Sequence, residues 1–146
     1  IENMQQENIL VEFLLEQKSK LIHLDLKVIF ESDFKPTELK RFMSRLDHNS
    51  FGINYDTGNS AALGFNPIEE FDAIGDRILN VHIKDRPLGG STVPLGEGDV
   101  DFPSVFSLLK SKGYQFNYIL QTARADDEKH MEVLSKYTDY LQHWLL

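Results

Sequence analysis

The sequence contains no cysteine, a single tryptophan and only 15 basic residues against 23 acidic ones. The lack of cysteine excludes a disulfide framework, a thiolate zinc site and a cysteine nucleophile, and it is compatible with a reducing cytoplasm, where we expect the protein. No apolar run reaches the roughly 18 to 20 residues of a membrane span. The net charge of −8 disfavours nucleic acid as a partner, since an acidic surface repels phosphate backbones.

The turn residues and the spacing of the hydrophobic residues divide the chain into alternating helices and strands. With 146 residues, 41% of them hydrophobic, we expect a single domain over residues 1–146. The predicted helices cover about residues 3–18, 36–46, 66–74, 101–113 and 126–144. The predicted strands cover about residues 24–31, 51–56, 78–85 and 118–122, and residues 87–98 form a long loop. This alternation predicts an α/β fold, in which helices cover a parallel sheet.

Polar side chains gather at the carboxyl ends of the four predicted strands. Side chains alternate between the two faces of a strand, so one face is apolar while the other ends in a polar residue. The four polar residues are Glu31, Asp56, His82 and Gln121. Active sites of parallel α/β proteins lie at this edge of the sheet, and carboxylates with an imidazole suit Mn, Mg, Zn or Co. We therefore expect one shared metal site, although any of these residues alone could be a turn former or an ordinary hydrogen-bonded group.

Three segments carry a resemblance to a known family. They are Asn54–Asn59 (NYDTGN), Val81–Arg86 (VHIKDR) and Leu95–Phe102 (LGEGDVDF). In this order and spacing they resemble the sugar-phosphate isomerase/epimerase family, the xylose-isomerase-like TIM barrels that include L-xylulose-5-phosphate and L-ribulose-5-phosphate 3-epimerases. The resemblance covers nearly the whole chain from about Leu24 onward. It implies an eight-stranded barrel in which Glu, Asp, His and Glu from the last four strands hold a divalent metal.

The resemblance assigns roles to the strand-end residues of this chain. By motif, Glu31, Asp56 and His82 correspond to the first three metal ligands, whereas Gln121 stands where the family typically has the second Glu. In the family mechanism the metal polarises a ketose phosphate while two carboxylates exchange a proton at the neighbouring carbon. Glu31 is then one catalytic group and Gln121 occupies the place of the other. Because an amide oxygen is too weak a base, we expect impaired proton transfer and weaker metal binding.

The length of the chain has a structural consequence. A complete (β/α)₈ barrel needs about 200 residues at minimum and about 250 typically, whereas this chain has four predicted strands. The resemblance equates them with the fifth to eighth strands, which makes the chain a half barrel. An open sheet of this kind exposes its inner face and two unpaired edges. We therefore expect either self-association or a partnership with a missing N-terminal half barrel.

Three cations lie at or after the ends of the third and fourth predicted strands. Lys84, Arg86 and Arg124 could neutralise a substrate phosphate or fix ligand carboxylates, the alternative being ordinary solvated charges. Two other function classes stay open. The chain could be a non-catalytic assembly or sugar-binding module that keeps the fold without the chemistry. An endonuclease of the apurinic-site type is disfavoured, because three metal ions would need more His and Asp at the strand ends and the acidic charge disfavours DNA.

Overall fold

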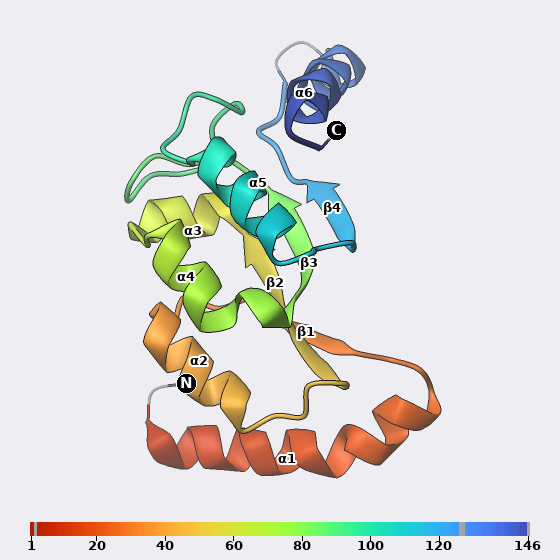
Figure 1. Cartoon of the computed structure of the whole chain (residues 1–146). Helices are drawn as coiled ribbons and strands as arrows, with labels where there is room; N and C mark the ends of the chain where they lie inside the picture. Colours follow the sequence, from red (N-terminus) through yellow and green to blue (C-terminus); the bar gives the residue numbers. More distant parts are fainter. Residues whose placement is uncertain (2, 126–127, 146) are drawn as a thin grey trace.

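The computed structural model describes residues 1, 3–125 and 128–145. This part of the chain confirms the predicted α/β class, with helices packed against a parallel four-stranded sheet (Figure 1). In chain order the elements are α1 (Met4–His23), β1 (Val28–Phe30), α2 (Pro36–Ser44), β2 (Phe51–Asp56), α3 (Thr57–Leu63), α4 (Pro67–Ile74), the 3₁₀ turn η1 (Gly75–Arg77), β3 (Ile78–Ile83), α5 (Phe102–Ser111), β4 (Asn117–Leu120) and α6 (His130–Leu145).

The four strands lie in the order of the chain, β1-β2-β3-β4, and every neighbouring pair is parallel. Asp56, the last residue of β2, is in register with His82 of β3. The carboxyl ends of the strands therefore meet at one edge of the sheet, which is the condition for a shared site. Within the part of the chain that the structure describes, β1 and β4 each have one neighbouring strand and form the edges of the sheet.

Helices α2, α4 and α5 cover one face of the sheet (Figure 1). Large side chains from these helices and from the covered face of β2 and β3 form two apolar clusters. One cluster includes Phe42 of α2 and Phe51 of β2, and the other includes Val81 of β3 and Leu109 of α5. Burial of this face provides the main driving force for folding and places the polar face of the sheet on the opposite side.

Helix α1 is joined to α2 by a buried carboxylate. Glu7 accepts hydrogen bonds from both terminal nitrogens of Arg41, at 2.7 and 2.6 Å, and from Arg45 at 2.6 Å. The hydrogen bond from Arg41 and that from Arg45 hold the pKa of Glu7 below its usual value, against the effect of burial. The ionised carboxylate is therefore the form that holds the two helices together at neutral pH.

A β-bulge in β3 interrupts the strict alternation of faces at two residues. Strict alternation puts Leu79 on the apolar face and Ile78 on the polar one. The structure shows Ile53 paired with Ile78 and Asn54 paired with Asn80, so the register shifts by one residue between them. Ile78 is part of the buried core. Leu79 lies beside Gly52, and a Cβ added to Gly52 would be 2.3 Å from Cδ1 of Leu79. The bulge thus reverses the two residues and leaves His82 on the polar face.

Most predicted helices are confirmed, and their ends follow from side-chain caps. Asn66 accepts from the Ile68 amide at the start of α4, and Asp101 accepts from the Ser104 amide at the start of α5. Several bounds differ from the prediction. Helix α1 extends to His23, so the first strand begins only at Val28. Helix α3 was not predicted, and the expected start of the last helix at Asp126 lies outside the described residues.

The second face of the sheet has an open, mixed surface. At its two edges Ile29 of β1 and Ile119 of β4 are 41% and 46% exposed. Between them lie the buried amides of Asn54 and Asn80. None of the described helices is long and apolar enough to cross a lipid bilayer.

Candidate metal centre

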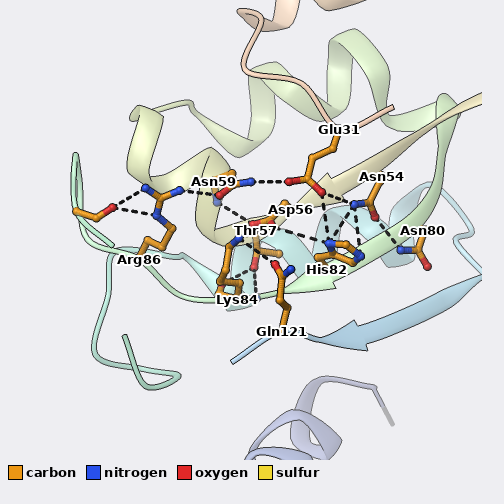
Figure 2. A network of polar contacts seen from close by, with 11 residues as sticks. Glu31, Asn54, Asp56, Thr57, Asn59, Asn80, His82, Lys84, Arg86 and Gln121 are labelled. Atoms are coloured by element: carbon orange, nitrogen blue, oxygen red, sulfur yellow. Dashed lines mark hydrogen bonds and ion pairs between the residues drawn. The ribbon is translucent and has the colours of Figure 1, made fainter. Parts of the chain in front are cut away.

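The structure brings three of the predicted ligands together at the carboxyl edge of the sheet. Glu31 directly follows β1, Asp56 ends β2 and His82 lies opposite it on β3. One ligand atom from each residue lies within 4.8 Å of the others. The exposed fractions of the side chains are 43% for Glu31, 21% for His82 and 1% for Asp56, so Glu31 is the most exposed residue of the cluster. Figure 2 shows how the three side chains lie.

The two carboxylate oxygens of Asp56 make different contacts. Oδ1 accepts the backbone N–H of Asn59 at 2.8 Å and thereby caps the start of α3. Oδ2 is buried and accepts no hydrogen bond of normal geometry, although the Lys84 ammonium is 2.9 Å away and His82 Nδ1 is 3.8 Å away. An oxygen held in this way beside a second carboxylate and an imidazole suits a divalent cation.

The residues after Asp56 fasten α3 to the end of β3. Thr57 Oγ1 accepts the backbone N–H of Lys84 at 3.0 Å and donates to the Lys84 carbonyl at 2.5 Å. Gly58 is required by close packing, because a Cβ there would lie 2.8 Å from the Lys84 side chain and 3.1 Å from its backbone. Each residue of the Asp-Thr-Gly motif therefore helps to keep the end of β2 and the start of α3 packed against the end of β3.

Two asparagines that were not predicted as site residues hold the Glu31 carboxylate (Figure 2). Asn54 Nδ2 donates to Oε2 at 2.7 Å and lies 3.1 Å from His82 Nδ1, while Asn59 Nδ2 donates to Oε1 at 2.8 Å. Asn54 is oriented in turn by Asn80, which donates to its Oδ1 at 2.7 Å. The available signal was the alternation of β2 and β3, which puts Asn54 and Asn80 on the face that ends in Asp56 and His82.

Gln121 is connected to the three clustered residues through Lys84. Its Oε1 accepts from Lys84 Nζ at 2.9 Å, and the same nitrogen is 2.9 Å from Asp56 Oδ2. Its backbone N–H continues the pairing with β3 by donating to the Ile83 carbonyl. The Lys84 ammonium thus links Gln121, the predicted fourth ligand, to the buried carboxylate, and a carboxylate at position 121 would meet this cation.

The three predicted substrate-binding cations differ in their surroundings. Lys84 is directed into the cluster and its side chain is only 12% exposed. Arg86 donates to the Asn59 side chain and to the Gly90 carbonyl. Arg124 is exposed on the segment after β4. The structure therefore puts Lys84 at the cluster, Arg86 on its rim and Arg124 at the surface beyond β4.

A buried carboxylate on the neighbouring helix α4 helps to hold α3 in place. Glu70 of α4 accepts hydrogen bonds from the Tyr55 hydroxyl at 2.9 Å and from the Ser60 hydroxyl. Burial raises the pKa of Glu70, and burial together with the charge of Glu70 raises the pKa of Tyr55 well above its usual value. These contacts connect α3 to β2 and α4, so the helix that carries Asn59 has a fixed position next to Asp56.

An open pocket of about 670 Å³ adjoins the cluster. Glu31, Asn59 and Arg86 line its polar end, and Phe34 and Leu63 belong to its apolar wall. Pockets of this size accept small organic ligands, and convergent polar groups at one end set the orientation of the ligand. The pocket therefore reaches the cluster at Glu31, whereas Asp56 and His82 do not line it.

Comparison with known proteins defines the family. The model of the family described as "Xylose isomerase-like TIM barrel" matches residues 4–138, and the chain belongs to this family. An inosose dehydratase of Geobacillus kaustophilus is 30% identical over 132 residues, which are 75% of this chain and 42% of the relative. The L-ribulose-5-phosphate 3-epimerase UlaE of Salmonella paratyphi C is 33% identical over 98 residues, which are 66% of this chain and 34% of the relative.

The solved structures confirm the fold. A xylose isomerase domain protein from Planctomyces limnophilus superposes with a TM-score of 0.78 at 21% identity, covering 96% of this chain and 52% of that protein. A xylose isomerase-like TIM barrel protein from Mycobacterium smegmatis in complex with magnesium gives 0.74 at 18% identity, covering 99% and 52%. The chain therefore spans about half the length of these structures and 34 to 42% of the two curated relatives.

Proposed function

We propose that the chain is the C-terminal half, strands five to eight, of a sugar-phosphate isomerase/epimerase-like barrel that acts on a ketose phosphate with a divalent metal. The observation that carries the proposal is the convergence of Glu31, Asp56 and His82 at the carboxyl edge of a parallel sheet. Membership of the xylose isomerase-like family and similarity to a sugar-phosphate epimerase support the substrate class.

The donor set fits the proposed cation. Two carboxylates and an imidazole are oxygen and nitrogen donors suited to Mn, Mg, Zn or Co, and Asp56 Oδ2 is buried without a hydrogen bond of normal geometry. Glu31, Asp56 and His82 would hold the ion, with Gln121 as a neutral fourth donor. A bound divalent ion would polarise the carbonyl and hydroxyl oxygens of the substrate.

Proton transfer and binding of the substrate's anionic end are assigned to other side chains of this chain. Glu31 is the proposed base, because it is the more exposed of the two carboxylates and lines the pocket. Lys84 and Arg124 are the candidates for binding the anionic end of the substrate. Gln121 cannot accept a proton at neutral pH, so exchange from the opposite face of the substrate lacks a base. We therefore propose a site that binds a ketose phosphate but epimerises it poorly.

NMR line broadening by Mn²⁺ tests where the substrate binds. Free Mn²⁺ binds the phosphate of a ketose phosphate and broadens the protons nearest to it most strongly. With the Mn²⁺-loaded protein we expect the opposite order, in which the protons on the carbons that flank the carbonyl broaden most. A panel of pentulose and hexulose phosphates provides the substrates, and glycerol phosphate, which has no carbonyl, provides the control. Broadening centred on the phosphate for every compound would contradict the proposed orientation.

The open sheet supports a second part of the proposal, a companion half barrel formed by a second copy. In a closed arrangement β4 of each copy would pair with β1 of the other, and the exposed Ile29 and Ile119 would face the common interior. A missing N-terminal half in a separate chain would fill the same space.

Sedimentation equilibrium at micromolar concentration tests this association. We expect a mass of at least twice 16.8 kDa, since unpaired edges and an exposed inner face favour pairing. Ile119→Lys should shift the equilibrium toward the monomer about tenfold, because it places a charge on the inner face. Ile68→Lys is the control, as Ile68 is 58% exposed on helix α4 outside the sheet. A stable wild-type monomer would rule out pairing of two copies.

A further inference from the structure

The Glu31 carboxylate is held more firmly than its position on the chain suggests. It follows a three-residue edge strand and its side chain is 43% exposed. Nevertheless, both of its oxygens accept amide hydrogen bonds, Oε2 from Asn54 and Oε1 from Asn59. Asn54 is a residue of the central strand β2, whereas Asn59 lies on helix α3. A residue that fixes the Asn59 side chain therefore also fixes one of the two contacts that orient Glu31.

Arg86 determines which way the Asn59 side chain faces (Figure 2). Its Nη1 donates to Asn59 Oδ1 at 2.7 Å. A guanidinium has no acceptor, so the oxygen of Asn59 must face Arg86 and its NH₂ group must face Glu31. The reverse orientation would put two donors together at Arg86 and two acceptors together at Glu31, and would break both hydrogen bonds.

The loop after β3 fixes Arg86 itself. Arg86 donates through Nε and Nη2 to the Gly90 carbonyl at 2.9 and 2.6 Å. The fully buried Asp85 holds the far part of the same loop by accepting the backbone N–H groups of Gly96, Gly98 and Val100. No side chain fits at Gly98, because a Cβ there would lie 2.1 Å from Asp85 Oδ1. The His-x-Lys-Asp-Arg and Gly-x-Gly segments therefore form one clamp.

We propose that Arg86 is a positioning residue that, through Asn59, orients Glu31 for binding a divalent cation. This role replaces the predicted contact between Arg86 and substrate phosphate. The inference rests on the proposed metal centre, since orientation of Glu31 matters for cation binding only if Glu31 is a ligand. The loop held by Asp85 carries the Gly90 carbonyl to which Arg86 is bound, so the clamp and the metal centre form one continuous unit.

The direction in which the cation affinity changes when Arg86 is replaced distinguishes a positioning role from a simple charge effect. If Arg86 acts only as a nearby positive charge, its removal reduces repulsion and tightens binding of a cation. If it positions Glu31, its removal weakens binding, because outer partners of a metal ligand are typically worth about 10 to 100-fold in affinity. Lysine at this position keeps the charge but cannot donate to Gly90 and Asn59 as a planar fork.

Calorimetry with Mn²⁺ alone measures this difference. We expect both Arg86→Gln and Arg86→Lys to weaken Mn²⁺ binding by about tenfold relative to the wild-type protein. Lys40→Gln, which removes an exposed charge on α2, is the control and should leave the affinity unchanged. Unchanged or tighter binding in the two Arg86 variants would overturn the proposal, since it would indicate a charge effect alone.

A measurement without metal keeps the positioning role separate from the metal proposal. In ¹H–¹⁵N spectra of the metal-free protein, the side-chain NH₂ resonances of Asn59 report its hydrogen bond to Glu31. Asn59→Ser identifies these resonances by their loss. We expect Arg86→Lys and Glu31→Gln each to shift them, while backbone resonances of α5 stay in place. Unmoved Asn59 resonances in Arg86→Lys contradict the positioning role, whereas shifted resonances in a protein that binds no Mn²⁺ would refute only the metal proposal.

Discussion

Asp56→Asn should weaken Mn²⁺ binding by on the order of 100-fold or more, the largest loss expected at the metal centre. Outer partners of metal ligands already cost about 10 to 100-fold, and a buried ligand that loses its charge should cost at least as much. Asp56 Oδ2 is buried without a hydrogen bond of normal geometry, so a bound cation would complete its contacts. The substitution also leaves the Lys84 ammonium, 2.9 Å away, without its anionic partner.

The local structure should survive this substitution, which makes the result interpretable. An asparagine side chain keeps an oxygen that can accept the Asn59 amide, so the cap of α3 is retained. Calorimetry with Mn²⁺ gives the affinity, and circular dichroism shows whether the fold is intact. Asp72→Asn, at an exposed position on α4, is the matched control and should bind Mn²⁺ like the wild-type protein. Equal affinities in the two variants would remove Asp56 from the metal centre.

The second large effect is a gain of activity at position 121. Gln121→Glu, with the missing N-terminal half barrel supplied in trans, should permit incorporation of solvent deuterium into a ketose phosphate, whereas the unmodified protein should exchange negligibly. A carboxylate has an ordinary pKa near 4, far above that of an amide oxygen, and can therefore accept the proton that Gln121 cannot. The nearby Lys84 ammonium, now hydrogen-bonded to the Gln121 oxygen, should keep the new carboxylate ionised.

Deuterium exchange followed by NMR over a panel of pentulose and hexulose phosphates measures this gain. Mn²⁺ affinity should rise as well, because a neutral donor becomes an anionic one. Gln115→Glu adds the same charge at an exposed position before β4 and is the matched control. Should the unmodified protein already exchange at an enzymatic rate, another group must serve as the second base and the two-carboxylate mechanism does not apply.

The alternation of the strands was enough to predict where the cluster lies. Asp56 and His82 fall on the polar face because side chains alternate along β2 and β3, and Glu31 follows β1 in the same phase. Strict alternation fails at Ile78 and Leu79, where the bulge shifts the register. No local pattern announces this bulge, since it depends on how Leu79 packs beside Gly52 on the neighbouring strand.

Helix α3 and the role of Asn59 could not be predicted in the same way. Residues 57–63, TGNSAAL, contain few large apolar side chains, so no helical periodicity is visible. The helix forms because Asp56 caps it and Thr57 binds the Lys84 backbone, contacts that span two strands. Asn59 reaches Glu31 only through this helix, so its role depends on the tertiary structure.

The central claim is that Glu31, Asp56 and His82 bind one divalent cation, and anomalous diffraction from crystals grown with Mn²⁺ tests it most directly. We predict a single strong anomalous peak within about 2.0 to 2.6 Å of an oxygen of Glu31, an oxygen of Asp56 and a nitrogen of His82. The same peak should be lost in Asp56→Asn crystals. A Mn²⁺ ion bound elsewhere, or none at a concentration that saturates the wild-type protein in solution, would contradict the account.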